Sequence, residues 1–572
     1  MNRMKLLRYV SVTGILFVVL SAEAKAEETT IQILHTNDVH GRAFEGDFDG
    51  MGYAKLAALI DETRSEHSFL LDAGDTFHGT TFASLEEGET IAQSLNLLGY
   101  DALVPGNHDF NYGLERLQEL EGKLDFPIIG ANLLNGQKKT FFDPYLIKEV
   151  NGTKIGIFGL STPETEYKTH PNNVRDVTFE DPSITASRMV EQLEEEGADL
   201  IIALAHLGID KSSEFTSEKV AEDVPGIDVI IDGHSHSELQ IGMEAGNETL
   251  IASAGEYVQN LGVVELVVED GELIDRTARL INQTEVEEIE PNQEMQSLLE
   301  ELEEAQQEIL AEPVGETKVE LNGEREQVRV EETNLGNFIA DVLRESTDAD
   351  IALTNGGGIR ASVAAGTITK GDLVEVSPFG NYGVTKDVTG EQLLEILEIG
   401  VKEYPEPSGG FPQISGFSFY IDEAEEPGTR VHSVTVDGEP LDLTKTYSLA
   451  TNDFLASGGD EYELLADLPV TNEYNALDEL LISYLREAGE VSPKVEDRIQ
   501  FGEDKKEGSN HSAQTESDSS LYVIQPGDTL FEIGLRENVT WTTLIEWNPT
   551  IRDEDLIYAG GTIKLSEGIG HK

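Results

Sequence analysis

Hydrophobic residues follow two alternating patterns between Ile31 and about Ile274. Short apolar runs of strand length alternate with stretches in which apolar residues recur every three or four positions, as in amphipathic helices. The predicted strands are 31–34, 68–71, 102–104, 128–130, 154–158, 200–204 and 229–231, and the predicted helices are 54–64, 90–97, 114–120 and 184–195. This alternation predicts an α/β domain with mixed sheets in layers and flanking helices.

The pattern changes three times beyond this region. A charged helical pattern has Met295, Leu298, Leu299, Leu302 and Ile309 on one face and predicts a connecting helix. Mixed strand and helix signals with Gly-rich turns then predict an α+β domain. Low apolar content indicates a flexible linker, after which apolar and aromatic residues return. The predicted boundaries are 27–290, 291–312, 313–502, 503–520 and 521–572.

The N-terminus has the order of an export signal. Basic residues precede an apolar stretch from Val10 to Leu20, and Ala24-Lys25-Ala26 offers a small-x-small cleavage site. The alternative is an uncleaved anchor, but 11 residues are few for a bilayer crossing of about 20. We therefore predict a signal peptide at 1–26 and a secreted mature chain without a transmembrane segment.

Composition limits how a functional site can be built. The chain has no cysteine, so it has no disulfides and any metal site must use His, Asp, Glu or Asn. Its 110 acidic residues against 39 basic ones give a formal net charge of -71, which argues against binding a nucleic acid polymer. The excess either keeps the protein soluble or reflects a high-salt habitat, where screening relieves the repulsion.

Polar clusters follow five of the predicted strands. They are Asp38 and His40, Asp72 and Asp75, Asn107 and His108, His206, and His234 and His236. Ligands bind at the carboxyl ends of strands in open α/β sheets, so these side chains are expected to converge. Nine of the twelve histidines lie between His35 and His236. Imidazole and oxygen donors suit Zn, Mn or a similar ion, and a shared carboxylate can bridge two ions.

The motifs at these strand ends resemble the calcineurin-like metallophosphoesterase domain of bacterial secreted 5'-nucleotidases. They read Asp38-Val39-His40, Gly74-Asp75, Gly106-Asn107-His108, Ala205-His206 and Gly233-His234-Ser235-His236. The resemblance covers about 30–500 and implies two divalent ions, Zn, Mn or similar. It places one ion on Asp38, His40, Asp75 and His236, and the other on Asp75, Asn107, His206 and His234. It further implies that His108 is catalytic and donates to the phosphoryl or leaving-group oxygen in the transition state, as an imidazolium held by an acceptor.

One position departs from the pattern of this family. Many of these nucleotidases have an Asp three residues after the catalytic His, and this chain has Asn111, which we predict as the second catalytic residue. Its carbonyl can accept the ring N–H but cannot stabilise a charged imidazole as a carboxylate does. Asn also occurs here in relatives that cleave 2',3'-cyclic nucleotides, so the substrate range stays open. His35 and His78 are expected to support the site or to be structural.

The second domain resembles the substrate-binding domain of the same nucleotidases. The motifs are Asn355-Gly356-Gly357-Gly358-Ile359-Arg360, Pro378-Phe379-Gly380-Asn381, and Phe454 followed by Gly458-Gly459-Asp460. The resemblance implies that Arg325, Arg329 and Arg360 hold the terminal phosphate, that Phe379 and Phe454 enclose the base, that Asn381 contacts it, and that Asp460 holds the ribose hydroxyls; Asn355 belongs to the same predicted site. Guanidinium groups suit phosphate oxygens, and aromatic faces stack on any base.

The tail resembles a LysM module. The segment from Tyr522 to Leu530 and the run Trp547-Asn548-Pro549 carry this resemblance, which implies a βααβ fold that binds peptidoglycan. A small accessory domain without glycan affinity is the alternative.

Taken together, the sequence predicts a secreted, cell-wall-associated dimetal 5'-nucleotidase that acts on extracellular nucleotides. The enzymatic alternatives are a 2',3'-cyclic-nucleotide phosphodiesterase/3'-nucleotidase and a nucleotide-sugar hydrolase with the same metal site. The alternative outside enzymes is a peptidoglycan-binding surface protein.

Overall fold

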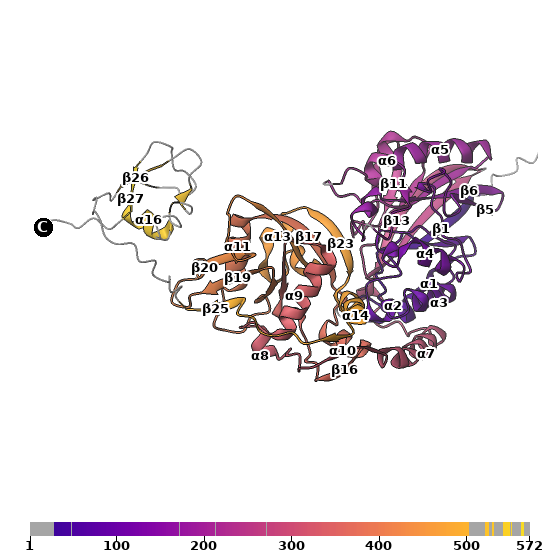
Figure 1. The fold of residues 1–572 in the computed structure, drawn as a ribbon. Coiled ribbons are helices and arrows are strands. Elements are labelled where there is room, and N and C mark those ends of the chain that lie inside the picture. Colours follow the sequence, from indigo (N-terminus) through magenta and orange to yellow (C-terminus); the bar gives the residue numbers. More distant parts are fainter. Residues whose placement is uncertain are drawn as a thin grey trace, which may run out of the picture. The chain divides into compact units, whose positions relative to one another are not determined.

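The structure, a computed structural model, divides into two compact units, Met1–Leu310 and Ala311–Lys572 (Figure 1). It describes residues 28–46, 49–170, 172–211, 213–269 and 271–502, and in the tail 521–524, 529–530, 533, 541–548, 551 and 562–565. The predicted signal peptide and the predicted linker 503–520 lie outside the described residues.

Two β-sheets pack face to face in the first unit. The strands of the first sheet are β1 (Glu28–Thr36), β2 (Ser68–Asp72), β3 (Ala102–Leu103), β12 (Asn260–Glu269) and β13 (Glu272–Asn282), in the order β13-β12-β1-β2-β3. Those of the second are β5 (Tyr145–Val150), β6 (Thr153–Ser161), β8 (Leu200–His206), β9 (Val229–Ile231), β10 (Met243–Ala245) and β11 (Thr249–Ala252), in the order β10-β11-β9-β8-β6-β5. Side chains of both sheets, such as Ile33 and Ile202, share one buried core.

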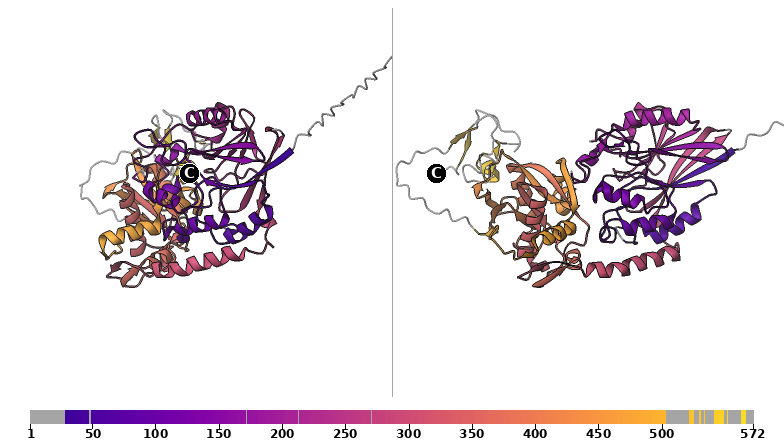
Figure 2. Two further views of the ribbon diagram at one scale, coloured as in Figure 1. Left: turned by 90° about the vertical axis from the view of Figure 1, so that its right-hand side faces the viewer. Right: turned by 45° about the vertical axis from the view of Figure 1, so that its right-hand side comes forward.

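Helices cover the outer faces of both sheets. The first sheet shares a core with α1 (Gly52–Thr63), α3 (Glu89–Leu98), α4 (Gly113–Glu121) and α7 (Gln293–Leu310), and the second with α5 (Pro182–Glu195) and α6 (Ser217–Asp223). Figure 2 shows this layering, with indigo helices on one side of the sheets and magenta helices on the other. The predicted layered α/β fold is confirmed. The apolar face predicted for α7 is buried at Met295, Leu299 and Leu302.

One predicted strand is wrong. Residues 128–130 make only isolated bridges, from Ile128 to Leu103 and from Ile129 to Asp143. The segment passes from the edge of the first sheet toward the second, so successive residues pair with different partners and no ladder forms. The other predicted strands and helices of this unit are present, with shifted ends.

The second unit is an α+β domain, as predicted. Its sheets have the orders β18-β15-β22-β17-β23, β21-β20-β19-β25 and β16-β14-β24. The strands are β14 (Pro313–Thr317), β15 (Ile351–Asn355), β16 (Gly366–Thr369), β17 (Tyr382–Thr389), β18 (Pro412–Ser415), β19 (Phe417–Ile421), β20 (Val431–Val436), β21 (Glu439–Pro440), β22 (Thr446–Asn452), β23 (Val470–Ala476), β24 (Glu490–Val491) and β25 (Ile499–Phe501). The helices include α8 (Arg325–Val328), α9 (Asn334–Thr347), α10 (Lys370–Val376), α11 (Gly390–Gly400), α12 (Asp453–Ala456) and α14 (Leu477–Ala488).

The described part of the tail forms a small core of its own. Strands β26 (Leu521–Val523) and β27 (Thr562–Lys564) pair antiparallel, and α16 (Trp541–Trp547) contributes Leu544 to the core. The Asn548 side chain joins helix and strand, since Nδ2 donates to Leu544 O at 2.7 Å and Oδ1 accepts from Lys564 N at 2.7 Å. The rest of the predicted βααβ module lies outside the described residues.

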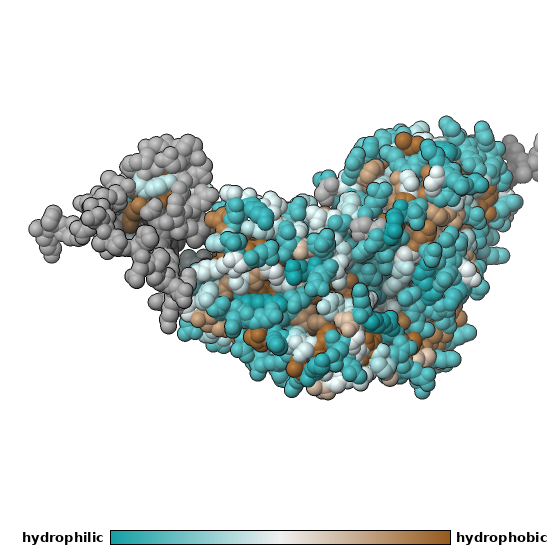
Figure 3. All heavy atoms as spheres, in the orientation of Figure 1, coloured by the Kyte–Doolittle hydropathy of each residue, from teal (hydrophilic) through white to brown (hydrophobic). Residues whose placement is uncertain are grey.

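The surface reflects the acidic composition. The face of the described part seen in Figure 3 is mostly hydrophilic, with scattered hydrophobic residues. Within the described ranges, no helix combines the length and apolarity needed to cross a bilayer.

Candidate active site

The seven predicted metal ligands all lie at the carboxyl ends of parallel strands. Asp38 and His40 follow β1, Asp75 follows β2, Asn107 follows β3, His206 ends β8, and His234 and His236 follow β9. The pairs β1–β2, β2–β3 and β8–β9 are parallel, so their ends meet at one edge of each sheet. Because the sheets pack face to face, the two edges bring these residues together.

Their donor atoms form three overlapping groups. One donor atom from each member lies within 4.8 Å of the others in the groups Asp38, His40 and His236; His40, Asp75 and His108; and Asp75, His206 and His234. His40 Nε2 is 3.2 Å from His236 Nε2, and His206 Nε2 is 3.2 Å from Asp75 Oδ2. Asp75 and His40 each belong to two groups, and of the two Asp75 is the carboxylate, which can bridge two ions.

The backbone at these residues is strained. Five of the seven predicted ligands have positive φ: Asp38 (50°), His40 (47°), Asp75 (57°), His234 (75°) and His236 (49°). This conformation costs a non-glycine residue about 1–3 kcal/mol and concentrates at functional sites. Gly106 allows the close approach of the neighbouring loop, since a Cβ there would lie 2.2 Å from Asp75 Oδ1.

Outer hydrogen bonds orient three of the histidine rings. His206 Nδ1 donates to Ala73 O at 2.7 Å, His236 Nδ1 lies 2.5 Å from Glu256 Oε2, and His234 Nε2 lies 3.0 Å from Glu164 Oε2. Each contact leaves the other ring nitrogen for the centre of the site, which is how metal-ligating histidines are usually held.

The side chain of Asn107 shows that the site has a place for a cation. Its Nδ2 donates to Lys168 O at 3.0 Å, which turns Oδ1 the other way. That Oδ1 is buried and accepts no hydrogen bond from any residue in the described ranges. Because an unpaired buried acceptor costs about 1–3 kcal/mol, a cation at this place would satisfy it. The residues present therefore fit the divalent ions that the resemblance implies.

Burial and charge separate the protonation states of the histidines. Burial alone would lower the pKa of His206, but the Asp75 carboxylate raises it to about 10. Burial lowers the pKa of His234 to about 3, helped by the charge of Lys168. His234 is therefore neutral near pH 7 and His206 is protonated in the ion-free chain, and both would have to be neutral to hold a divalent ion.

The contact between His108 and Asn111 differs from the sequence expectation. Asn111 Nδ2 lies 3.2 Å from His108 Nδ1, and Asn111 Oδ1 accepts from the Thr169 hydroxyl at 2.8 Å. The Asn111 carbonyl is thus occupied, so its amide donates to the ring and leaves the ring proton on Nε2. Burial lowers the pKa of His108 to about 4, against the opposing charge of Asp75. The lowered pKa and this contact favour a neutral His108 ring with its proton on Nε2, and its role as a transition-state donor stays a prediction.

Sequence reasoning missed the segment after β6, which holds this site from one side. Glu164 contacts His234, the Lys168 backbone oxygen holds Asn107, and Thr169 holds Asn111. The available signal was topology, because the strand 154–158 was predicted and its carboxyl end lies beside that of β8. Glu256, which follows β11, had no comparable signal.

Asp109 and His78 support the site without belonging to the ligand set. The Asp109 carboxylate accepts from four backbone N–H groups, those of Asp75, Thr76, Phe77 and Gly106, at 2.8–2.9 Å. It therefore ties the loop after β2 to the loop after β3. The His78 ring stacks on His108 with centroids 6.0 Å apart and an interplanar angle of 7°.

The predicted phosphate-binding arginines gather in the second unit. Burial and the charges of Arg325 and Arg360 lower the pKa of Arg329. The buried Arg329 Nε has no hydrogen-bond acceptor among the described residues. Clustered guanidinium groups with an unused donor form a site suited to an anion.

The other predicted substrate residues lie on connected loops of the same unit. Arg360 stands 5.4 Å from the ring centre of the exposed Phe379. Asn381 Nδ2 donates at 2.8 Å to Oδ1 of Asp453, the residue before the exposed Phe454. Asn355 Nδ2 donates to Asp460 Oδ2 at 2.7 Å. Asn381 and Asp460 are thus partly engaged within the protein.

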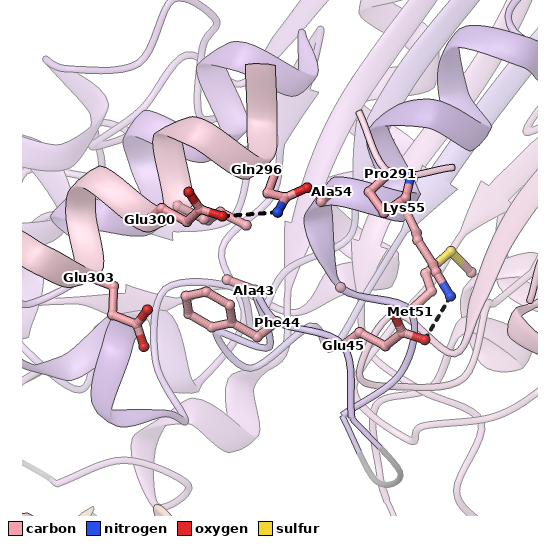
Figure 4. Close-up of a pocket in the computed structure, with 12 residues that line it drawn as sticks. Ala43, Phe44, Glu45, Met51, Ala54, Lys55, Pro291, Gln296, Glu300 and Glu303 are labelled. Carbon is pink, nitrogen blue, oxygen red and sulfur yellow. Dashed lines mark hydrogen bonds and ion pairs between the residues drawn. The ribbon is translucent and has the colours of Figure 1, made fainter. Parts of the chain in front are cut away.

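A cavity of about 290 Å³ lies elsewhere in the first unit. The helix α7 supplies Gln296, Leu299, Glu300 and Glu303, and the segment around the start of α1 supplies Phe44, Glu45, Met51 and Lys55 (Figure 4). None of its lining residues is a predicted metal ligand or catalytic residue, so it is separate from the candidate active site.

Comparison with known proteins agrees with this geometry. Residues 31–238 match the calcineurin-like phosphoesterase family, 313–467 match the 5'-nucleotidase C-terminal domain, and 522–566 match the LysM domain. The trifunctional nucleotide phosphoesterase protein YfkN of Bacillus subtilis is 34% identical over 82% of this chain, which spans only 35% of the length of YfkN. Protein UshA of Yersinia enterocolitica is 32% identical over 82% of this chain and 93% of its own length.

A solved structure supports the same assignment. The 5'-nucleotidase precursor of Thermus thermophilus is 31% identical and aligns with a TM-score of 0.51 over 83% of this chain and 99% of that chain. This chain therefore belongs to the 5'-nucleotidase family and carries a calcineurin-like phosphoesterase domain, a 5'-nucleotidase C-terminal domain and a LysM domain.

Proposed function

We propose that the protein is a metal-dependent 5'-nucleotidase that releases phosphate from extracellular nucleotides. The observation that carries this proposal is the convergence of six of the seven predicted ligand side chains, three of whose rings have outer partners. The family assignment supports it, as does the name of the Thermus relative, a 5'-nucleotidase precursor.

We assign two divalent ions, Zn, Mn or similar, to these ligands. Asp38, His40, Asp75 and His236 would hold one, and Asp75, Asn107, His206 and His234 would hold the other. When bound, such ions neutralise phosphoryl oxygens and lower the pKa of a water molecule.

The remaining roles fall to groups of the chain itself. His108 donates through Nε2–H to the phosphoryl or leaving-group oxygen, while Asn111 keeps its ring in place. In the second unit, Arg325, Arg329 and Arg360 bind the phosphate, Phe379 and Phe454 stack on the base, and Asn355, Asn381 and Asp460 complete the nucleotide site.

A second candidate function is hydrolysis of 2',3'-cyclic nucleotides with the same residues. Asn111 favours it, because the chain presents an amide where a carboxylate would charge His108. The Bacillus relative is named a trifunctional nucleotide phosphoesterase, which is compatible with a broader substrate range.

We further propose a secreted protein attached to the cell wall. The match of 522–566 to LysM domains supports peptidoglycan as the partner of 521–572, and the N-terminal pattern supports export through a signal peptide at 1–26. Retention of the full chain on purified peptidoglycan, compared with a chain ending at Gly502, tests this location. Equal retention of both would refute it.

Phosphate release measured with malachite green tests the activity. AMP, ADP, UDP-glucose and 2',3'-cyclic AMP are compared with Mn²⁺, Zn²⁺ or EDTA present, and Asp75→Asn is the inactive control. The nucleotide products are also separated by chromatography, because opening the cyclic phosphate or cleaving UDP-glucose releases no inorganic phosphate. We expect release from AMP that EDTA abolishes. Absence of release from AMP with either metal, while cyclic AMP is opened, would favour the second candidate.

A further inference from the structure

The backbone of Lys168 is held beside the candidate metal site through both its N–H and its carbonyl group. It follows the short helix η2 (Pro163–Glu166), and its N–H donates to Glu164 O at 2.8 Å. Its carbonyl oxygen accepts from Asn107 Nδ2 at 3.0 Å. The main chain at Lys168 is therefore fixed relative to a predicted metal ligand.

The ammonium group of Lys168 reaches the ring of another predicted ligand. Nζ lies 3.2 Å from His234 Nε2 and 3.2 Å from Glu164 Oε2, and the side chain is 25% exposed. In a chain with 39 basic and 110 acidic residues, a cation at this edge is not expected from composition alone.

The hydrogen-bond inventory leaves at least one donor on this ammonium. Lys168 Nζ has two near neighbours, His234 Nε2 and Glu164 Oε2, and the ring tautomer decides whether His234 accepts from it. These contacts engage at most two of the three ammonium N–H groups. At least one N–H group is left for solvent or a bound anion, and the partial exposure leaves room for either.

We propose that Lys168 is a substrate-binding residue, whose ammonium binds an anionic oxygen of the phosphoryl group from the side of His234. The proposal rests on the nucleotidase function and adds to it a cation within the metallophosphoesterase domain. A compact ammonium suits this place, because it supplies one point charge and shares it between Glu164 and a phosphoryl oxygen.

The test removes the positive charge of Lys168 and keeps an unbranched apolar side chain in its place. Lys168→Met and Lys168→Arg are compared with Lys219→Met, which breaks another i,i+4 ion pair, that with Asp223 at 2.8 Å. Inorganic phosphate is titrated calorimetrically into each Mn²⁺-loaded full chain, KM and kcat are measured with AMP, and metal content is measured by mass spectrometry.

We expect Lys168→Met to weaken phosphate binding and raise the KM for AMP about tenfold, or about 1.4 kcal/mol, with unchanged metal content. In Lys168→Arg the phosphate affinity and the KM for AMP should stay within about threefold of those of the unsubstituted protein. In Lys219→Met both should equal those of the unsubstituted protein. Phosphate affinity and KM within twofold in Lys168→Met would overturn the proposal, as would metal loss alone. Phosphate binding that depends on Lys168 in a protein inactive toward every nucleotide would sustain the anion site and refute the nucleotidase function.

Discussion

Replacing Glu164 by Gln should weaken metal binding at the proposed site of Asp75, Asn107, His206 and His234. Burial would raise the pKa of Glu164, but its contacts with His234 and Lys168 lower it well below its usual value, so the group is ionised. Gln keeps an oxygen near His234 Nε2 and removes the negative charge. The substitution therefore isolates the electrostatic part of the 3.0 Å contact.

The expected loss of metal affinity follows from the burial of the Glu164–His234 pair. Loss of an outer partner of a metal ligand typically costs 10–100-fold in affinity, about 1.4–2.8 kcal/mol. Glu164 is 9% exposed and His234 is 4% exposed, so water screens this pair little. Glu256 holds His236 in the same way, but these side chains are 30% and 35% exposed. The matched change Glu256→Gln should therefore cost only about threefold, as exposed ion pairs do.

Zinc affinity is the assay. The full chain is stripped with a chelator and titrated with Zn²⁺ against a competing chelating dye, at 0.1 M and 1 M NaCl. High salt should reduce the loss of Zn²⁺ affinity in Glu256→Gln, because the screening length falls to about 3 Å at 1 M. The loss in Glu164→Gln should be the same at both salt concentrations, because that pair is buried. The reasoning from burial is wrong if the Zn²⁺ affinity of Glu164→Gln stays within twofold of that of the unsubstituted protein. It is also wrong if Glu256→Gln loses more Zn²⁺ affinity than Glu164→Gln does.

Four further predictions concern substrate, pH and salt. Arg360→Ala should raise the KM for AMP while sparing hydrolysis of bis-p-nitrophenyl phosphate; equal loss on both would count against a separate nucleotide site. Asn111→Asp should raise the pKa of His108 above about 4 and increase the ratio of kcat/KM for AMP to that for 2',3'-cyclic AMP; an unchanged ratio places substrate choice elsewhere. Burial raises the pKa of Asp453 from 3.8 to about 6, so the folded protein keeps a proton between these values that the unfolded chain loses. This group should lower the free energy of unfolding by about 3 kcal/mol as pH rises through that window, and Asp453→Asn should remove that contribution while those of other buried carboxyl groups stay; parallel melting curves against pH for both proteins would contradict this. The melting temperature should rise with NaCl because the net charge is -71; a flat or falling curve would exclude salt adaptation.

The convergence of the predicted ligands at one edge could be anticipated from the sequence because each of them follows an apolar run. Strands buried on both faces give continuous apolar stretches, such as 200–204, and their ends are visible as a change to Gly, His, Asp and Asn. Parallel pairing then places those ends together. The run 128–130 is likewise without polar side chains, but it crosses between sheets, and composition alone does not separate these cases.

The partners of the ligands could not be predicted in the same way. Thr169 meets Asn111 from 58 positions along the chain, and Glu164 meets His234 from 70. Such contacts depend on how loops from different strands fold over one edge, which leaves no local pattern. The sequence allowed Asn111 to accept from His108, and only the position of Thr169 reverses that bond.

Hydrogen bonds within the chain hold the candidate metal site together. The first sheet supplies Asp38, Asp75 and Asn107 with one histidine, and the second supplies only histidines. Bonds already join the two sets, since His206 Nδ1 donates to Ala73 O and His234 N donates to Asp38 Oδ1 at 3.0 Å. Because the donors are positioned in advance, less of the binding energy of the ions is needed to order them.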